Sequence, residues 1–254
     1  MLRIYRVEHG GASRYVAERE GRWRVISGDV FGRFEEGAEI SSEDAQLLAP
    51  VQPSKIVCVG LNYKDHAAEQ KKALPAEPLL FIKPSTSVIG PGAAIEVPGW
   101  AGRVDYEAEL GLVIRKPTFK VRANRAQEHI LGAICVNDVT ARELQARDGQ
   151  YTRAKGFDTF APIGPCIAIG LDGRDLQVRG YVNGDLRQDS RTRELIFTIP
   201  ELVEFISSIM TLLPGDIIST GTPSGIGPIK PGDQVTIHVE GVGALTNPVV
   251  AREG

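Results

Sequence analysis

The sequence has 254 residues, of which 42% are hydrophobic and 24% are charged, as in an ordinary soluble globular protein. Its 29 basic and 32 acidic residues give a net charge of −3, and the sequence contains no long basic run. Both features argue against nucleic acid or an anionic membrane as a partner. A membrane-spanning helix needs about 20 apolar residues, and no apolar run is that long. The stretch MLRIYRVEHGG lacks the apolar core of a signal peptide. We therefore expect a cytoplasmic protein.

Residues 1–49 consist of short hydrophobic pieces separated by glycines. The pieces LRIYRV, SRYVAER and RWRVISG predict a small, three-stranded antiparallel β unit. Pro50 and Pro53 mark its boundary, so a second domain is expected over residues 53–254.

The second domain is rich in short strands and turns. Buried strands are expected at residues 55–60, 79–84 and 129–138, and after two Pro-Gly-Asp turns at 214–216 and 231–233. Helices are expected at residues 62–73, 139–149 and 198–213, the last with Thr198 and Glu201 spaced for a capping box. Because helices do not alternate regularly with strands, we expect an α+β, mostly β sandwich or roll and reject a doubly wound sheet or α/β barrel.

The stretch RVDYEAELGLVI, residues 103–114, places carboxylates at every second position of an expected strand. Asp105, Glu107 and Glu109 would share one face, and the apolar run after Glu109 suggests that the strand enters the core. A solvated face is the ordinary alternative. Buried carboxylates without partners repel each other and resist desolvation, and a divalent cation between them removes both problems.

Asp138 offers a third oxygen ligand, because it ends the apolar strand ILGAICVN just before a helix; the alternative is a helix N-cap. Oxygen ligands without histidine or cysteine favour Mg²⁺ or Mn²⁺, and Ca²⁺ also fits.

Further polar residues can surround such a metal. Arg142 and Gln145 lie three apart on one helix face, and Arg can hold a carboxylate with two hydrogen bonds. Lys155 precedes an apolar segment, and Lys83 ends a buried strand, although a lone lysine is usually a surface residue.

His66 and Glu69 in DHAAE lie three residues apart on a short helix. A histidine oriented by a carboxylate is a candidate general base, and a surface ion pair is the alternative. The loop GTPSGIGP, residues 221–228, could present backbone N–H groups to an anion. It lacks the Gly-Lys-Ser/Thr ending of a P-loop, which excludes nucleoside triphosphate binding by that motif.

Together these motifs resemble the fumarylacetoacetate hydrolase family over about residues 53–250. The matching stretches, in chain order, are VCVGLNYKDHAAE, LFIKPST, VDYEAELGLVI, NDVTARELQ, AKGFDTFAPIGP, VNGDLRQ, GDIISTGTPSGIGPIKPGD and VTIHVEGVGALTNPV. The N-terminal unit is similar to that of bacterial members that act on intermediates of aromatic degradation.

The resemblance implies a β-sandwich roll, a homodimer and a central Mg²⁺ or Mn²⁺. The implied metal ligands are Glu107, Glu109 and Asp138. The implied contacts to the carboxylate and oxo groups of a 2-oxo acid are Arg142, Gln145, Lys155 and Thr222, and Lys83 is a further candidate. The implied catalytic pair, His66 and Glu69, lies on a mobile lid.

Two further positions bear on the expected metal site. Asp105 has no ligand role in the resemblance and is interpreted as a carboxylate beside the ligands. Family members that hydrolyse fumarylacetoacetate itself carry an additional acidic ligand ahead of the histidine, where this chain has Asn62. That difference argues against fumarylacetoacetate as the substrate.

The expected activity is metal-dependent chemistry on a small 2-oxo acid through a stabilised enolate. Hydrolysis of a C–C bond in an acylpyruvate is favoured, because His66 and Glu69 can activate water and Lys155 adds positive charge. The alternatives are isomerisation of 2-hydroxyhepta-2,4-diene-1,7-dioate and decarboxylation of 5-oxopent-3-ene-1,2,5-tricarboxylate or oxaloacetate. A catalytically inactive metal-binding scaffold is the alternative of another class.

Overall fold

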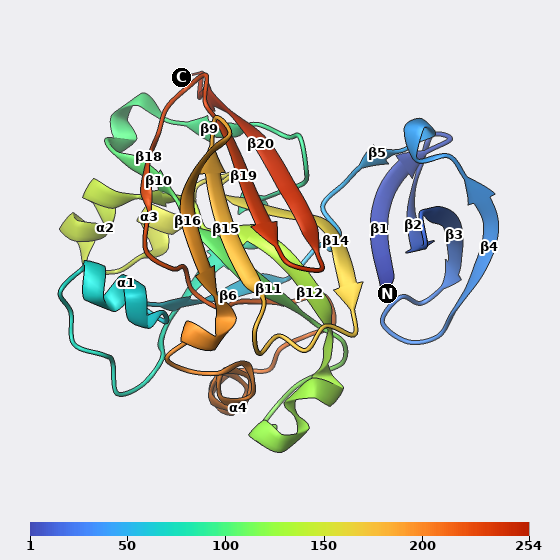
Figure 1. Ribbon diagram of the computed structural model, residues 1–254, viewed down its shortest axis with the longest axis horizontal. Coiled ribbons are helices and arrows are strands. Elements are labelled where there is room, and N and C mark those ends of the chain that lie inside the picture. The colour runs from blue at the N-terminus through green and yellow to red at the C-terminus, as the bar shows by residue number, and fades with distance from the viewer. Residues whose placement is uncertain (254) are drawn as a thin grey trace.

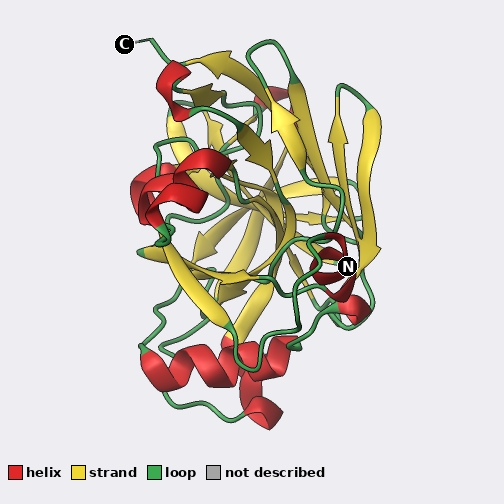
Figure 2. Cartoon of the chain, turned by 90° about the vertical axis from the view of Figure 1, so that its left-hand side faces the viewer, coloured by secondary structure: helices red, strands yellow, loops and turns green. Residues whose placement is uncertain are grey.

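A computed structural model describes residues 1–253. Strands outnumber helices by far, and Figure 2 shows the helices at the periphery of the strands. The helices are α1 (Lys64–Glu69), α2 (Arg142–Asp148), α3 (Thr152–Lys155) and α4 (Ile199–Ile209), with five 3₁₀ turns, η1 (Ser42–Asp44), η2 (Ser85–Ser87), η3 (Gly99–Ala101), η4 (Ala123–His129) and η5 (Thr192–Glu194). None of the helices within residues 1–253 has the length and apolar character that a membrane crossing requires.

The largest sheet has twelve strands and runs through both predicted regions of the chain. Its main path is β4 (Phe34–Ile40), β3 (Arg22–Gly28), β2 (Ala12–Arg19), β1 (Leu2–His9), β14 (Ala161–Ile169), β12 (Ile130–Asn137), β11 (Ala108–Ile114), β17 (Ile217–Ser219), β6 (Lys55–Gly60) and β7 (Leu79–Pro84), with β5 (Gln46–Leu47) on β1 and β8 (Val88–Ile89) on β14.

Two smaller sheets complete the fold. One has five strands, β16 (Asp185–Arg191), β15 (Gln177–Val182), β19 (Gln234–Val239), β20 (Gly243–Ala251) and β9 (Ile95–Val97). The other has three, β13 (Thr140–Ala141), β10 (Val104–Tyr106) and β18 (Gly227–Ile229). In Figure 1 the five-stranded sheet lies across β11, β12 and β14, and the N-terminal strands stand to one side. The mostly β roll is thus confirmed.

The main core fills the space between the two larger sheets. Leu110 and Leu112 of β11 point to this side, and they belong to one buried cluster with Val239 of β19 and Leu245 of β20. The other face of β11 carries Val113, which packs in a second cluster beneath β1 and β6. Both faces of β11 are therefore covered, which explains its uniformly apolar sequence after Glu109.

Several expected elements differ from the structure. The helix expected over 198–213 ends at Ile209. The N-terminal unit has a fourth antiparallel strand, β4, whose largely exposed sequence FEEGAEI shows no apolar alternation. The strand expected over 103–114 is interrupted at Glu107, because β10 pairs in the three-stranded sheet and β11 in the largest one. The helix expected over 62–73 is shorter and spans Lys64–Glu69. Two residues after its end, Lys71 adopts a left-handed conformation with φ 52°.

Other local predictions are confirmed. Gly149 ends α2 in the left-handed conformation, and the Glu201 carboxylate accepts hydrogen bonds from the N–H and hydroxyl of Thr198 at the start of α4. The Pro-Gly-Asp turns lead into β17 and β19, where Asp216 N–H donates to Leu213 O and Asp233 N–H donates to Lys230 O, each at 3.0 Å.

Candidate metal centre and active site

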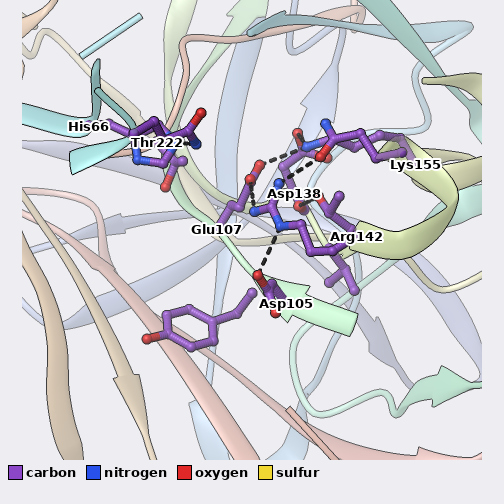
Figure 3. Close-up of polar contacts among 12 residues, drawn as sticks. His66, Asp105, Glu107, Asp138, Arg142, Lys155 and Thr222 are labelled. Atoms are coloured by element: carbon purple, nitrogen blue, oxygen red, sulfur yellow. Dashed lines mark hydrogen bonds and ion pairs between the residues drawn. The ribbon is translucent and has the colours of Figure 1, made fainter. Parts of the chain in front are cut away.

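Three carboxylates converge where β10, β11 and β12 meet. Figure 3 shows two of them, Glu107 and Asp138. Glu107 links β10 to β11, Glu109 belongs to β11, and Asp138 follows β12; one oxygen of each lies within 4.8 Å of the others. The antiparallel register brings them together, because Glu109 pairs with Val136 and Asp138 N–H donates to Glu107 O at 3.0 Å. All three are buried, with at most 4% of the residue exposed. The solvated-face alternative does not hold for these residues.

Two buried lysines neutralise part of this acidic cluster. Lys155 Nζ donates to Glu107 Oε2 at 2.7 Å and to Asp138 Oδ2 at 2.6 Å, and Lys83 Nζ donates to Asp138 Oδ1 at 2.6 Å. Burial disfavours the charge on Lys155, but the neighbouring Asp138 and Glu107 outweigh it and raise the lysine pKa. The charged form of Lys155 is therefore favoured, which suits this residue to stabilising negative charge.

The two glutamates differ in their electrostatics. Burial and then repulsion by Asp138 and Glu107 raise the pKa of Glu109 to about 8, although the hydrogen bond from Ser219 Oγ at 2.6 Å opposes this. Burial acts in the same direction on Glu107, but the charges of Arg142 and Lys155 outweigh it and lower its pKa. A divalent cation beside the cluster would stabilise the charged form of Glu109, and the oxygen donors fit Mg²⁺ or Mn²⁺.

Arg142, the first residue of α2, is fixed by acidic and amide partners (Figure 3). Its guanidinium donates to Glu107, to Asp105 Oδ2 at 2.8 Å and to Gln145 Oε1 at 2.9 Å. Asp105 is fully buried and also accepts two hydrogen bonds from Arg103. Arg103 Nε donates to Oδ1 at 2.7 Å, and Nη2 donates to Oδ2 at 3.0 Å. Asp105 therefore orients Arg142 and lies outside the three-carboxylate cluster.

Thr222 is positioned by Gln188, a residue that the sequence analysis missed. Gln188 is fully buried on β16; its amide donates to Thr222 Oγ1 and Pro223 O, each at 2.8 Å, and accepts the Ala108 N–H at 2.9 Å. A Cβ at Gly180 would lie 2.8 Å from Gln188 Oε1, so glycine makes room for the amide. The only sequence signal was its place in VNGDLRQ, because its neighbours on β16 are mostly exposed.

His66 forms hydrogen bonds at both ring nitrogens. Nδ1 lies 2.8 Å from Glu69 Oε2, and Nε2 lies 2.7 Å from Gln70 Nε2. Because an ionised carboxylate only accepts, we assign the ring proton to Nδ1, which leaves Nε2 to accept from the Gln70 amide. The second oxygen of Glu69 accepts a hydrogen bond from the Gly225 N–H at 3.0 Å. This bond connects α1 to the glycine-rich loop of residues 221–228.

The loop of residues 221–228 does present backbone N–H groups, but they donate to the protein's own carboxyl groups. Gly221 N–H donates to Glu109 at 2.9 Å, and Gly225 N–H donates to Glu69. Gly225 has φ 94°, and a Cβ there would lie 2.1 Å from Arg187 O, so this contact requires glycine.

A cavity of about 220 Å³ joins most of the predicted site residues. Those that line it are His66, Glu107, Glu109, Asp138, Arg142, Gln145, Lys155 and Thr222. Glu69 reaches the cavity only through His66. Lys83, expected to contact the substrate, is instead fully buried behind Asp138 and is absent from the lining.

A second cavity of about 450 Å³ adjoins the first. The residues that line both are Gln70, Lys72, Arg142, Gln145 and Tyr151. Three of these, Gln70, Lys72 and Tyr151, carried no recognisable signal in the sequence, because single polar residues in short helices and loops are common at surfaces.

Comparison with known proteins identifies the family. Residues 55–250 match the family described as fumarylacetoacetate (FAA) hydrolase C-terminal, and residues 2–50 match one described as Rv2993c-like, N-terminal. The chain belongs to the fumarylacetoacetate hydrolase family. Members of the family are enzymes and typically use a divalent metal, for which the Glu107, Glu109 and Asp138 cluster is suited.

The relatives include both uncharacterised proteins and isomerases. Protein Rv2993c of Mycobacterium tuberculosis is 52% identical over 82% of this chain and 80% of its own length. An oxaloacetate tautomerase, mitochondrial, of Xenopus laevis is 39% identical over 83% of this chain and 70% of its own length. The crystal structure of a 2-hydroxyhepta-2,4-diene-1,7-dioate isomerase from Mycobacterium marinum is 43% identical, covers all of both chains and has a TM-score of 0.93.

Proposed function

We propose that the protein is a divalent-metal-dependent tautomerase or isomerase of 2-oxo acids, which moves a proton between the carbon next to the oxo group and an oxygen or a more distant carbon. The observation that carries the proposal is the single cavity containing His66, the three-carboxylate cluster and two fixed cations, Arg142 and Lys155. The tautomerase and isomerase names of relatives at 39% and 43% identity favour proton transfer as the reaction.

The metal and the cations have separate roles in this proposal. Glu107, Glu109 and Asp138 would hold Mg²⁺ or Mn²⁺, which supplies Lewis-acid polarisation of the carboxylate and oxo oxygens. Arg142 would orient the substrate carboxylate, with Gln145 and Thr222 beside it. Lys155 would stabilise the negative charge that develops on the oxo oxygen, because it is a buried cation already held in place.

His66 is the group suited to move the proton. Its Nε2 lone pair would accept a proton from the carbon next to the oxo group; the C–H electron pair forms the new C=C bond, and the carbonyl pair moves to oxygen. Glu69 keeps the ring proton on Nδ1 and stabilises the imidazolium that results, which then returns the proton from Nε2 to the enolate oxygen or to the more distant carbon. Gln70 occupies Nε2 in the structure, so its amide must give way to the substrate.

Hydrolysis of an acylpyruvate is the second candidate, because the same His66–Glu69 pair could deprotonate a water that attacks the distal carbonyl. Decarboxylation of oxaloacetate needs the cations but no water-activating base. The inactive-scaffold alternative is less consistent with a cavity in which His66, Arg142 and Lys155 all remain.

An activity panel distinguishes these candidates. Enol-oxaloacetate, 2-hydroxyhepta-2,4-diene-1,7-dioate, an acylpyruvate and keto-oxaloacetate should be supplied with Mg²⁺ or Mn²⁺ and followed by ultraviolet absorbance and product analysis. We expect metal-dependent proton transfer in at least one of the first two. If only the acylpyruvate is cleaved, the protein is a hydrolase. If none of the four substrates is converted, the inactive-scaffold alternative is favoured.

We also propose a homodimer that covers the free edge of β7. This strand ends the path of the largest sheet and exposes Leu79 and Ile82, with 50% and 41% of each residue accessible. Light scattering on a sizing column should report a dimer for the wild type and a monomer for Ile82→Glu. Leu186→Glu is the matched control, because Leu186 is equally exposed on β16 at the edge of the other sheet. A monomeric wild type would contradict the proposal.

A further inference from the structure

The segment after α1 places the side chain of Lys72 at the boundary between the two cavities. The Lys71 N–H donates to Ala68 O at 3.1 Å and the Lys72 N–H donates to Ala67 O at 3.0 Å, with Lys71 left-handed. These two bonds form a Schellman motif, so the backbone of Lys72 is fixed relative to the helix that bears His66. Lys72 lines both cavities, whereas Lys71 lines neither.

The charges around the site leave Lys72 without a counterpart. The ion pairs around the site join three carboxylates, Asp105, Glu107 and Asp138, to four cations, Lys83, Arg103, Arg142 and Lys155. Glu109 instead accepts hydrogen bonds from Ser219 Oγ and the Gly221 N–H. Glu69 is engaged by His66 and Gly225. Lys72 is exposed and takes part in none of the ion pairs found within residues 1–253, the neighbouring His66–Glu69 pair included.

The same boundary offers a neutral hydrogen-bond donor. Arginine can only donate, so the bond from Arg142 fixes the oxygen of the Gln145 amide toward Arg142. The NH₂ group of Gln145 therefore faces away from Arg142, and Gln145 lines both cavities. Asp105 also lines this cavity of about 450 Å³, but its carboxylate is paired with Arg103 and Arg142. The donor amide of Gln145 and the unpaired ammonium of Lys72 therefore favour an anionic occupant.

We propose that the second cavity receives a second carboxylate of the substrate and that Lys72 is the residue that selects for it. The inference rests on the proposed function, because the first carboxylate and the oxo group are taken to occupy the cavity of His66 and the acidic cluster. With a divalent cation bound there, one substrate carboxylate offsets only part of the positive charge, and a second one offsets more. The substrates are then 2-oxo dicarboxylates, or their enols, in preference to monocarboxylic acylpyruvates.

The test compares two ligands of equal chain length. 2-Oxoglutarate and 2-oxopentanoate share the 2-oxo acid end and differ in having a carboxylate or a methyl group at the far end. Their dissociation constants should be measured by calorimetry on Mg²⁺-loaded protein, for the wild type, Lys72→Gln and Lys72→Arg. Lys71→Gln is the matched control, one residue away and outside both cavities.

The wild type should bind 2-oxoglutarate about fivefold more tightly than 2-oxopentanoate, the upper range for one partly exposed ion pair. Lys72→Gln should lose most of this ratio, whereas Lys72→Arg and Lys71→Gln should keep it. Raising the salt concentration should reduce the ratio in the wild type, because exposed ion pairs are screened.

Two outcomes overturn the inference and remain distinguishable. Equal affinities for both ligands in the wild type, or an unchanged ratio in Lys72→Gln, would remove the role of Lys72 while leaving the 2-oxo acid site intact. Failure of both ligands to bind with Mg²⁺ would instead overturn the proposed function, and the inference with it.

Discussion

Arg142 Nε donates a 2.8 Å hydrogen bond to Oδ2 of Asp105, a fully buried carboxylate that Arg103 also contacts. This pairing fixes the guanidinium plane of Arg142 while its other nitrogens reach Glu107 and Gln145. The orientation of the residue expected to hold the substrate carboxylate therefore depends on a residue outside the cavity that contains the acidic cluster.

Asp105→Asn should test this dependence. The amide keeps the shape but removes a charge and one acceptor, so Arg142 loses its fixed plane. We expect the KM for a 2-oxo acid to rise about tenfold, the loss of roughly one charge-assisted hydrogen bond, with the Mg²⁺ affinity little changed. Steady-state kinetics and Mg²⁺ titration measure the two quantities. A rise in KM together with an equal loss of Mg²⁺ affinity would instead place Asp105 in the metal site.

His66→Ala should separate reactions that need a base from those that do not. Proton transfer at carbon, or acylpyruvate hydrolysis, should fall about 10²-fold or more, the usual contribution of a general base. Oxaloacetate decarboxylation should fall much less. Glu69→Gln should give a milder version of the same pattern, because it leaves the ring less well oriented. Equal losses in all reactions would assign His66 to binding or closure of α1.

The raised pKa of Glu109 predicts that metal binding depends on pH. Its pKa of about 8 means that the carboxyl is largely protonated in the metal-free protein at neutral pH and must lose that proton to bind a cation. Mg²⁺ affinity should therefore rise with pH and level off above about pH 8. Calorimetry in buffers of different ionisation enthalpy should show a proton released on binding at pH 7. Glu109→Gln should bind more weakly and release none; a pH-independent wild type would refute the assignment.

Asp216 is predicted to stabilise the fold at neutral pH. The buried carboxylate accepts Ser54 Oγ and Lys55 Nζ at 2.6 Å each and Leu213 N–H at 2.8 Å. Burial opposes its ionisation, but the Leu213 N–H, Lys55 and Ser54 outweigh it and lower the pKa. Because the folded-state pKa lies below the unfolded one, this stabilisation is complete above the unfolded pKa and is lost as the pH falls through the folded pKa.

Asp216→Asn should accordingly lower the free energy of unfolding by about 2 kcal/mol at pH 7 and by less in acid. Urea unfolding at both pH values is the measurement. Asp185→Asn is a surface control and should change little, because Asp185 contacts only the exposed Arg187. A difference that grows in acid would contradict the assigned direction of the pKa shift.

The sequence predicted the acidic cluster because periodicity identifies which residues share a strand face. Glu107 and Glu109 alternate in a run that becomes wholly apolar, and Asp138 ends another apolar strand. The break at Glu107 was not predictable, because it arises from pairing of β10 with β18, more than a hundred residues away. For the same reason the role of Asp105 required the position of Arg142, which comes from a different element.

Other parts of the site left no local signal. Gln188 lies on a strand with mostly exposed neighbours, and only its contact with Thr222 and Ala108 reveals its function. Lys72 is exposed like the adjacent Lys71, and only its place in the lining of both cavities distinguishes the two lysines. The division into residues 1–49 and 53–254 remains a prediction about independent folding, since β1 pairs with β14 across that boundary.

The central claim is that Glu107, Glu109 and Asp138 hold a divalent cation on which turnover depends. The most direct measurement is the activity of chelator-treated, desalted protein during titration with Mg²⁺ and Mn²⁺, in parallel with Glu109→Gln, on the best substrate of the panel. We expect the treated wild type to be inactive and to recover with either metal, while Glu109→Gln recovers little at the same concentrations. Full activity of the metal-free wild type, or full recovery of Glu109→Gln, would contradict it.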